Sequence, residues 1–239
     1  MTFPRKGLSA AILAGGLGTR LRPVVGDRPK VLAPVAGRPF LEFLLNQLAR
    51  AGIPEVTLLV GYGSDQVQTA FGNSYCNLKL NYSTESSLLG TGGALRLALP
   101  LLPGDTILLL NGDSYCDANI VDLSAVHESR GAAATLALAE APDGSRYGRV
   151  IRGEDSRIER FEEKGGPAAP AWINAGVYLV DRRVVEGIEP GRNVSLERDV
   201  LPVWVGRGQV FGVPAGRFID IGTPESFAEA AEFFDRLSL

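Results

Sequence analysis

The stretch that decides the fold is Ala10–Lys30, which reads AAILAGGLGTRLRPVVGDRPK. It begins in an apolar run of strand length and continues at once into a glycine-rich loop. The loop glycines are Gly15, Gly16 and Gly18. Because glycine has no Cβ, backbone N–H groups in such a loop can approach phosphate oxygens and form an anion-binding nest. Arg20 and Lys30 add positive charge, so we interpret the stretch as a buried strand followed by a triphosphate-binding loop.

Two common phosphate-binding motifs do not fit this stretch. A Walker A loop has the pattern GxxxxGK[ST], which the residues after Gly15 do not supply. A dinucleotide-binding fingerprint needs a third glycine at the position of Leu21, which argues against an NAD-dependent Rossmann dehydrogenase. The paired glycines alone would equally suit an ordinary turn, so the interpretation depends on the whole stretch.

The composition limits the classes of function. The chain has 239 residues and is 45% hydrophobic, which suits one α/β domain. Its net charge of −3 argues against a nucleic-acid or anionic-membrane surface, and its apolar runs are short, so we expect a cytoplasmic protein. The single histidine, His127, is expected on the solvated face of a helix. Cys76 and Cys116 are expected as core or near-core thiols without a disulfide, and a zinc cluster is excluded.

Strand and helix patterns alternate through the first half of the chain. Expected strands are Leu8–Leu13, Glu55–Tyr62, Leu78–Glu85 and Thr106–Leu110. Expected helices are Phe40–Ala51, a short helix with Ser64 as its N-cap, and the C-terminal half of SSLLGTGGALRLALPLL (86–102). This order predicts an α/β fold, with a Rossmann-like, mixed but mostly parallel sheet flanked by helices.

The second half has shorter strands and longer loops. The expected strands are Thr135–Ala139, Arg149–Ile151, Ile173–Val180 and Val210–Val213. The chain closes with an amphipathic helix capped by Thr223, with Pro224 at its first position. We therefore expect one domain over residues 1–239, with a nucleotide-binding half to about residue 130 and a second half with the closing helix after it.

Two aspartates are candidates for a metal site. Asp113, in NGDS, follows an apolar strand, and ligands of open α/β sheets bind at the carboxyl ends of strands. Asp220, in DIGTP, directly precedes a helix. If the two carboxylates converge, they would bind Mg²⁺ together with phosphate oxygens. The alternatives are an Asx turn at Asp113 and a simple strand end at Asp220.

Several motifs, in order, resemble those of the sugar-1-phosphate nucleotidyltransferases. GGLGTRLRP and PKVLAPVAGRPFLE match the family's signature, and LGTGGAL, RYGR, FEEK and INAGVY follow it along the chain. The resemblance implies the family's GT-A-like fold, with a sugar-binding half over about residues 131–239 and with Arg20, Lys30 and Asp113 as catalytic residues. The implied nucleotide-binding residues are Leu13, Ala14, Gly15, Gly16, Gly18, Thr19, Glu85, Gly90 and Thr91. The implied sugar phosphate-binding residues are Asn111, Tyr147, Gly148, Glu163, Lys164 and Asn174, and the implied metal ligands are Asp113 and Asp220.

Glu85 stands where this family places the residue that reads the base. Its carboxylate could accept from N1–H and N2–H₂ of guanine, which favours GTP over ATP. A solvated loop charge is the alternative, and uridylyl enzymes can also carry a glutamate here. Gly165 and Gly166 depart from the family pattern, which often has proline after Lys164, so the position of this loop is open.

The second-half motifs SRYGRV, EKGG, INAGVY, SLERDV and FIDIGTP look most like those of D-glycero-α-D-manno-heptose 1-phosphate guanylyltransferases. A helix starting at a serine cap accounts equally well for SLERDV. The resemblance implies an enzyme that joins GTP and this sugar 1-phosphate with Mg²⁺, releasing pyrophosphate. A mannose 1-phosphate guanylyltransferase, a relative using ATP or UTP, and a non-catalytic nucleotide-sugar sensor are the alternatives. The sequence does not fix the oligomeric state, and a homodimer stays open.

Overall fold

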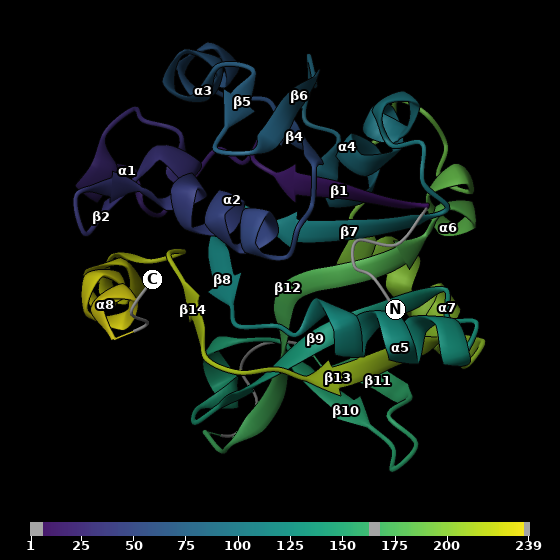
Figure 1. Ribbon diagram of the computed structural model, residues 1–239. Coiled ribbons are helices and arrows are strands. Elements are labelled where there is room, and N and C mark those ends of the chain that lie inside the picture. Colours follow the sequence, from purple (N-terminus) through teal and green to yellow (C-terminus); the bar gives the residue numbers. More distant parts are fainter. Residues whose placement is uncertain (1–6, 163–167, 237–239) are drawn as a thin grey trace.

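The computed structural model describes residues 7–162 and 168–236, and four parallel strands form the middle of its main sheet (Figure 1). These strands are β1 (Leu8–Leu13), β4 (Glu55–Val60), β6 (Leu78–Thr84) and β7 (Thr106–Asn111). β1 lies between β4 and β7, and β6 pairs with the other side of β4. Since the four strands are parallel, their carboxyl ends lie along one edge, where ligands of such sheets bind.

The second half of the chain extends the same sheet in a mixed arrangement. β12 (Ala171–Asp181) pairs antiparallel with β7, and β9 (Ala134–Ala141) pairs antiparallel with β12 and parallel with β13 (Val210–Pro214). The two ends of the sheet are formed by β10 (Arg149–Arg152) with β11 (Ile158–Glu162), and by β5 (Ser74–Tyr75). The resulting order is β11-β10-β12-β7-β1-β4-β6-β5, with β9 and β13 on a branch.

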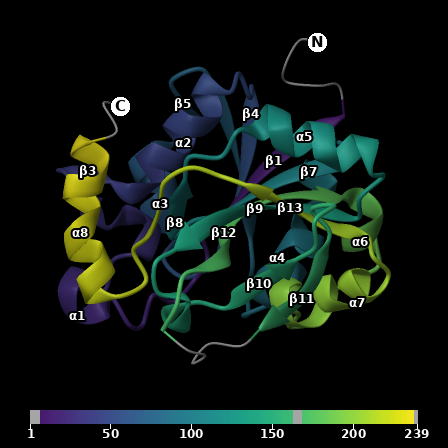
Figure 2. The same cartoon turned by 90° about the horizontal axis from the view of Figure 1, so that it is seen from below.

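Helices cover both faces of the sheet (Figure 2). Alternate residues of β1 lie on opposite faces of the sheet. Ala10 and Ile12 therefore pack in one hydrophobic cluster, and Ala11 packs in the other. The first cluster includes side chains of α2 (Phe40–Arg50), α3 (Ser64–Phe71), α5 (Ile120–Ser129) and α8 (Pro224–Asp235). The second includes side chains of α4 (Gly90–Ala98), α6 (Arg182–Glu186) and α7 (Leu201–Gly206). In the described part of the chain, no helix has the length and apolar character needed to cross a membrane.

Two small sheets lie outside the main one. One pairs β2 (Pro34–Val35) with β3 (Arg38–Pro39), and the other pairs β8 (Ser114–Cys116) with β14 (Phe218–Asp220). In the second sheet Asp220 pairs with Ser114, and the N–H of Ile221 donates to the carbonyl of Asp113 over 2.8 Å. This pairing joins segments about 100 residues apart and brings both candidate metal ligands to the same edge.

The predicted fold class is confirmed, and the first-half strands lie within one or two residues of their expected bounds. The closing helix starts at Pro224 with Thr223 as its N-cap, as expected, and Thr223 and Ser226 form a reciprocal capping box. The cap predicted at Ser64 is wrong. Ser64 is the first helical residue, and the N-cap is Gly63, whose φ of 66° favours glycine.

Two further sequence expectations are wrong. His127 is buried, with 5% of its surface exposed, and its Nδ1 lies 3.1 Å from the hydroxyl of Thr135. Burial lowers the pKa of His127 to about 4. Cys76 is exposed in the tight turn between β5 and β6, whereas Cys116 is buried as expected, and both thiols are free. A single histidine on a helix does not reveal which face meets a neighbouring strand, so the sequence could not settle this point.

Candidate active site

The glycine-rich loop leaves β1 at the carboxyl edge of the parallel strands. The N–H of Ala14 donates to the carbonyl of Leu59 over 2.7 Å, which fixes the start of the loop against β4. Gly18 has a φ of 59°, and a Cβ there would lie 3.2 Å from the Cβ of Lys30. The loop therefore folds back so that Lys30 lies beside its glycines, as the stretch Ala10–Lys30 predicts.

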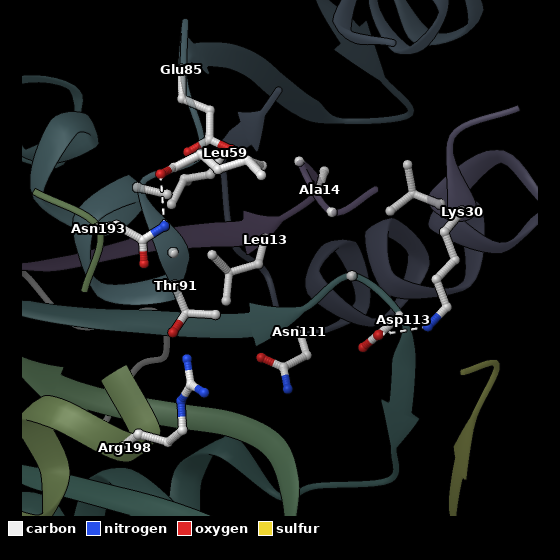
Figure 3. A pocket seen from close by; sticks show the side chains of 17 residues that line it. Leu13, Ala14, Lys30, Leu59, Glu85, Thr91, Asn111, Asp113, Asn193 and Arg198 are labelled. Carbon is white, nitrogen blue, oxygen red and sulfur yellow. Dashed lines mark hydrogen bonds and ion pairs between the residues drawn. The ribbon is translucent and has the colours of Figure 1, made fainter. Parts of the chain in front are cut away.

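A cavity of about 440 Å³ lies along this edge (Figure 3). Most of the residues predicted to bind the nucleotide line it, together with predicted catalytic and sugar-side residues. The predicted residues in its walls are Leu13, Ala14, Gly15, Gly16, Lys30, Glu85, Gly90, Thr91, Asn111 and Asp113. Gly18 and Thr19 belong to the same loop but are not among the described residues that line the cavity. Its size suits a nucleotide.

Glu85 lies at one end of the cavity, away from Lys30 and Asp113 (Figure 3). Its Oε2 accepts from the N–H of Leu89 over 3.0 Å. Its Oε1 lies 2.8 Å from the place where a Cβ of Gly61 would be and 3.3 Å from that of Gly15, so both glycines make room for the carboxylate. Burial raises the pKa of Glu85, and the hydrogen bond from Leu89 opposes this effect. The position leaves a half-buried hydrogen-bond acceptor in the cavity wall.

Lys30 and Asp113 form an ion pair at the other end of the cavity. The distance from Nζ of Lys30 to Oδ2 of Asp113 is 2.7 Å, and the Lys30 side chain is 11% exposed. A Cβ on Gly112 would lie 2.1 Å from the carbonyl oxygen of Leu13, so only glycine allows the end of β7 to touch the end of β1. Beside this contact, Oδ1 of Asn111 is buried without a hydrogen-bond partner in the described structure. Such an acceptor is suited to a ligand hydroxyl.

A second cavity, of about 210 Å³, shares Asn111 and Asp113 with the first. Its other walls come from the loop, β8, β12, β14 and the start of α8. The lining residues besides the shared pair are Arg20, Ser114, Tyr147, Asn174, Phe218, Asp220, Gly222 and Thr223. The hydroxyl of Tyr147 donates to Oδ2 of Asp220 over 2.7 Å. Two compartments therefore meet at Asn111 and Asp113, with Lys30 beside the junction.

Of the other predicted sugar-side residues, one lines the second cavity, one lines neither cavity, and two lie outside the described residues. Asn174 lines the second cavity, and its side chain donates to the hydroxyl of Tyr178 over 2.8 Å and accepts from the N–H of Gly176 over 3.0 Å. Gly148 lies next to Tyr147 in the chain but is not among the described residues that line either cavity. Glu163 and Lys164 lie outside the described residues.

The two aspartates fit a divalent cation. Asp113 and Asp220 both line the second cavity, and one oxygen of Asp113 is bonded to Lys30. The oxygens of Asp220 accept from Tyr147, Gly222 and Ser226, which holds this carboxylate in place. Over residues 7–162 and 168–236, no cluster of three or more His, Cys, Asp or Glu side chains could hold an ion alone. An ion bound by Asp113 and Asp220 would therefore need further ligands, and substrate phosphates and water commonly supply these in magnesium sites.

The sequence profile of the family described as "Nucleotidyl transferase" matches residues 9–236. The chain belongs to this family. Two curated relatives are sugar-1-phosphate guanylyltransferases. One is a mannose-1-phosphate guanylyltransferase from Mycobacterium tuberculosis, 38% identical over 94% of this chain and 64% of its own length. The other is a D-glycero-α-D-manno-heptose 1-phosphate guanylyltransferase from Aneurinibacillus thermoaerophilus, 37% identical over 93% of this chain and 96% of its own length.

Two solved structures are similar in fold to this chain. HddC from Yersinia pseudotuberculosis, complexed with GMP-PN, is 31% identical, with a TM-score of 0.82 over 95% of this chain and 99% of that one. A putative glucose-1-phosphate thymidylyltransferase from Bacillus anthracis, at 23% identity and a TM-score of 0.84, shows the same fold. The chain spans about two thirds of the length of the mycobacterial relative and nearly all of the heptose enzyme.

Sequence reasoning missed one wall of the first cavity. Asn193 and Arg198, from the loop and π-helical turn before α7, line the first cavity, and Arg198 points toward Thr91 in Figure 3. Asn193 also donates to the carbonyl of Leu88 over 2.8 Å. The signal was present in LGTGGAL. A Cβ on Gly90 would lie 2.6 Å from the carbonyl oxygen of Val194, so these glycines mark where another segment packs closely.

Proposed function

We propose that this chain catalyses the joining of GTP and D-glycero-α-D-manno-heptose 1-phosphate to give GDP-heptose and pyrophosphate. The observation that carries the proposal is the meeting of two compartments at Asn111 and Asp113, beside Lys30. A reaction between a nucleotide and a sugar phosphate needs two adjoining pockets with cationic groups at the junction. The relatives named as guanylyltransferases support the class of substrates.

The proposed reaction is an in-line displacement at the α-phosphorus of GTP. A phosphate oxygen of the sugar 1-phosphate forms the new O–P bond while the bond to the β-phosphate oxygen breaks, and pyrophosphate leaves with that electron pair. The attacking phosphate is already ionised at pH 7, so no protein base or nucleophile is required. Catalysis then comes from positioning and from neutralising charge.

The roles proposed for Lys30, Asp113 and Asp220 follow from their positions, and those of Arg20 and Lys164 from the resemblance to the family. Lys30, at the junction, neutralises charge that develops on the α-phosphate. Arg20, which lines the second cavity, and the loop N–H groups bind the β- and γ-phosphates, and Lys164, which lies outside the described residues, orients the sugar phosphate. Asp113 and Asp220 are the proposed ligands of Mg²⁺, which neutralises phosphate charge when it is bound.

We propose that Glu85 selects guanine by accepting hydrogen bonds from N1–H and N2–H₂. Glu85→Gln should lower kcat/KM for GTP by about 10- to 100-fold, because one charged hydrogen-bond acceptor is lost. ITP lacks the 2-amino group, so the wild-type protein should use ITP poorly and the variant should lose most of that preference. Since burial raises the pKa of Glu85, acidification should reduce GTP use at a higher pH than the usual pKa of a glutamate would allow, with a weaker fall in the variant.

The choice of heptose over mannose is the finest part of the proposal. The two sugars differ at the C6 end by one hydroxymethyl-sized extension, which a pocket discriminates by about 1–3 kcal/mol. The combination of second-half motifs supports heptose, and the mannose-1-phosphate enzyme at 38% identity supports the alternative.

The test is pyrophosphate release with Mg²⁺ across GTP, ATP, UTP and CTP, each combined with manno-heptose, mannose and glucose 1-phosphates. We expect turnover confined to GTP with the manno-heptose phosphate. Turnover with GTP and mannose 1-phosphate would keep the guanylyltransferase activity and replace the sugar. Turnover with another nucleotide would contradict the role of Glu85, and no turnover with any pair would contradict the proposed activity.

A further inference from the structure

Glu197 forms a hydrogen-bonded link between the two cavities, although it is not among the described residues that line either of them. It lies in the π-helical turn Leu196–Val200. Its Oε2 accepts from the hydroxyl of Thr91 over 2.8 Å, and its Oε1 accepts from the hydroxyl of Tyr178 over 3.1 Å. The hydroxyl of Ser195 donates a further bond over 3.1 Å. One carboxylate thus joins α4, β12 and its own turn.

The first half of the link reaches the nucleotide compartment. Thr91 lines the larger cavity in the first turn of α4. Its hydroxyl donates to Glu197 and accepts from the N–H of Leu196 over 2.8 Å, so both hydrogen-bonding directions are fixed. The N–H groups of Gly92 and Gly93 also donate to the carbonyl of Val194. The first turn of α4 and the segment before α7 therefore pack as one unit.

The second half of the link reaches the sugar compartment. Tyr178 is fully buried, so its hydroxyl needs partners inside the protein. It donates to Glu197 and accepts from the side chain of Asn174 over 2.8 Å. The oxygen of Asn174 accepts from the N–H of Gly176, which fixes the orientation of the whole carboxamide. Asn174 lines the smaller cavity, so its placement depends on Tyr178 and, through it, on Glu197.

Stability alone is a weak reason for this arrangement. Glu197 is only partly buried, and hydrogen bonds that water can replace contribute little net stability to a fold. At Glu197, two hydrogen-bonded paths each end on a cavity wall, one at Thr91 and the other at Asn174. A link of this kind fixes the relative position of two bound reactants, and an in-line reaction depends strongly on that position.

We infer that Glu197 is a positioning residue that holds Thr91 toward the nucleotide and Asn174 toward the sugar phosphate. The inference rests on the proposed function. It predicts that the two halves of the link can be separated by experiment, because each half serves one substrate. Loss of the Thr91 hydroxyl should weaken nucleotide binding, loss of the Tyr178 hydroxyl should weaken sugar phosphate binding, and loss of Glu197 should weaken both.

The test compares steady-state kinetics of variants with the substrate pair that the wild-type protein uses. Thr91→Val should raise KM for the nucleotide about tenfold and leave KM for the sugar phosphate within about twofold, and Tyr178→Phe should do the reverse. Glu197→Ala should raise both KM values and lower kcat. Glu197→Gln should recover the nucleotide half of the loss more than the sugar half, because its amide oxygen can still accept from Thr91 while its N–H₂ group leaves the Tyr178 hydroxyl without an acceptor. Glu189→Gln, in a surface pair with Arg192, is the matched control and should behave as wild type.

The outcomes separate positioning from a merely structural role. A structural role would reduce the active fraction and the melting temperature of Glu197→Ala with both KM values unchanged, and this result would overturn the inference. If Glu197→Ala does not fold, the double variant Thr91→Val/Tyr178→Phe should reproduce the rise in both KM values, and unchanged values would overturn it. If the wild-type protein turns over normally and Glu197→Ala has wild-type kinetics, only the inference about Glu197 is refuted. If the wild-type protein shows no turnover, the proposed function is overturned as well.

Discussion

Replacing Lys30 by methionine tests the proposed chemistry most directly. The ammonium group of Lys30 lies 2.7 Å from Asp113. A Cβ built on Gly222, a residue close to Asp220, would lie 3.5 Å from the same ammonium group. Lys30 therefore lies among the groups at the junction of the two cavities. Methionine keeps most of the length and apolar contact of the lysine and removes only the charge. The variant therefore isolates the effect of that charge on the reaction.

The expected effect is much larger on turnover than on stability. Removing one preorganised contact to a developing charge typically lowers kcat by about 100- to 1,000-fold, or about 2.7–4 kcal/mol. The Asp113 side chain is 46% exposed, so water can solvate it when its partner is lost, and the free energy of unfolding should fall by about 1 kcal/mol. The two effects are measured by pyrophosphate release and by urea unfolding.

Lys79→Met is the matched control. Lys79 pairs with Glu55 over 3.5 Å, and its side chain is 65% exposed, so this pair contributes little to stability and lies on the surface of β6. The control should keep wild-type kcat and lose less than about 0.5 kcal/mol of stability. A kcat of Lys30→Met within threefold of the control would refute the role assigned to Lys30, as would a loss fully explained by unfolded protein.

Two further predictions concern the fold. Because burial lowers the pKa of His127 to about 4, the unfolded chain takes up a proton at a higher pH than the folded protein does, and the free energy of unfolding should fall by up to about 3 kcal/mol as the pH drops from 6.5 to 4. Urea titrations across this range should show a shallower fall for His127→Leu, and equal slopes for the two proteins would contradict the assignment. Phe234 is 4% exposed and stacks on Phe43 with ring centroids 3.8 Å apart, so Phe234→Ala should cost about 3–5 kcal/mol of unfolding free energy. A loss below 1 kcal/mol would mean that α8 is not anchored through this ring.

The first half of the fold could be predicted because its signals are local. The apolar runs of β1, β4 and β7 end at Gly, Pro, Asn or Asp, which bounds each strand from the sequence alone. The second half could be predicted only in outline. β8 and β14 have three residues each and pair across about 100 residues, and no local pattern reveals such a partner.

The same distinction between local and long-range signals applies to the candidate site. Lys30, Glu85 and Asp113 lie in motifs that stand next to strand ends, so their position at the sheet edge follows from the order of elements. Asn193 and Arg198 lie about 80 residues after the last parallel strand of the first half, and their place in the wall depends on the packing of one loop against α4. Gly90 and Gly93 indicate from the sequence that another segment packs closely against α4. They do not indicate which segment it is.

The glycines also require a different interpretation of the motif that decides the fold. On Gly16 a Cβ would meet nothing within 4 Å, so this position alone among the three loop glycines is open to a phosphate on that side. Gly15 is needed because Gly61 and Glu85 lie close to it, and Gly18 because its φ is positive and Lys30 packs against it. Most glycines of the motif therefore mark contacts within the protein. Those contacts place Glu85 and Lys30 at opposite ends of one cavity, so the packing of the loop glycines determines where the proposed chemistry would occur.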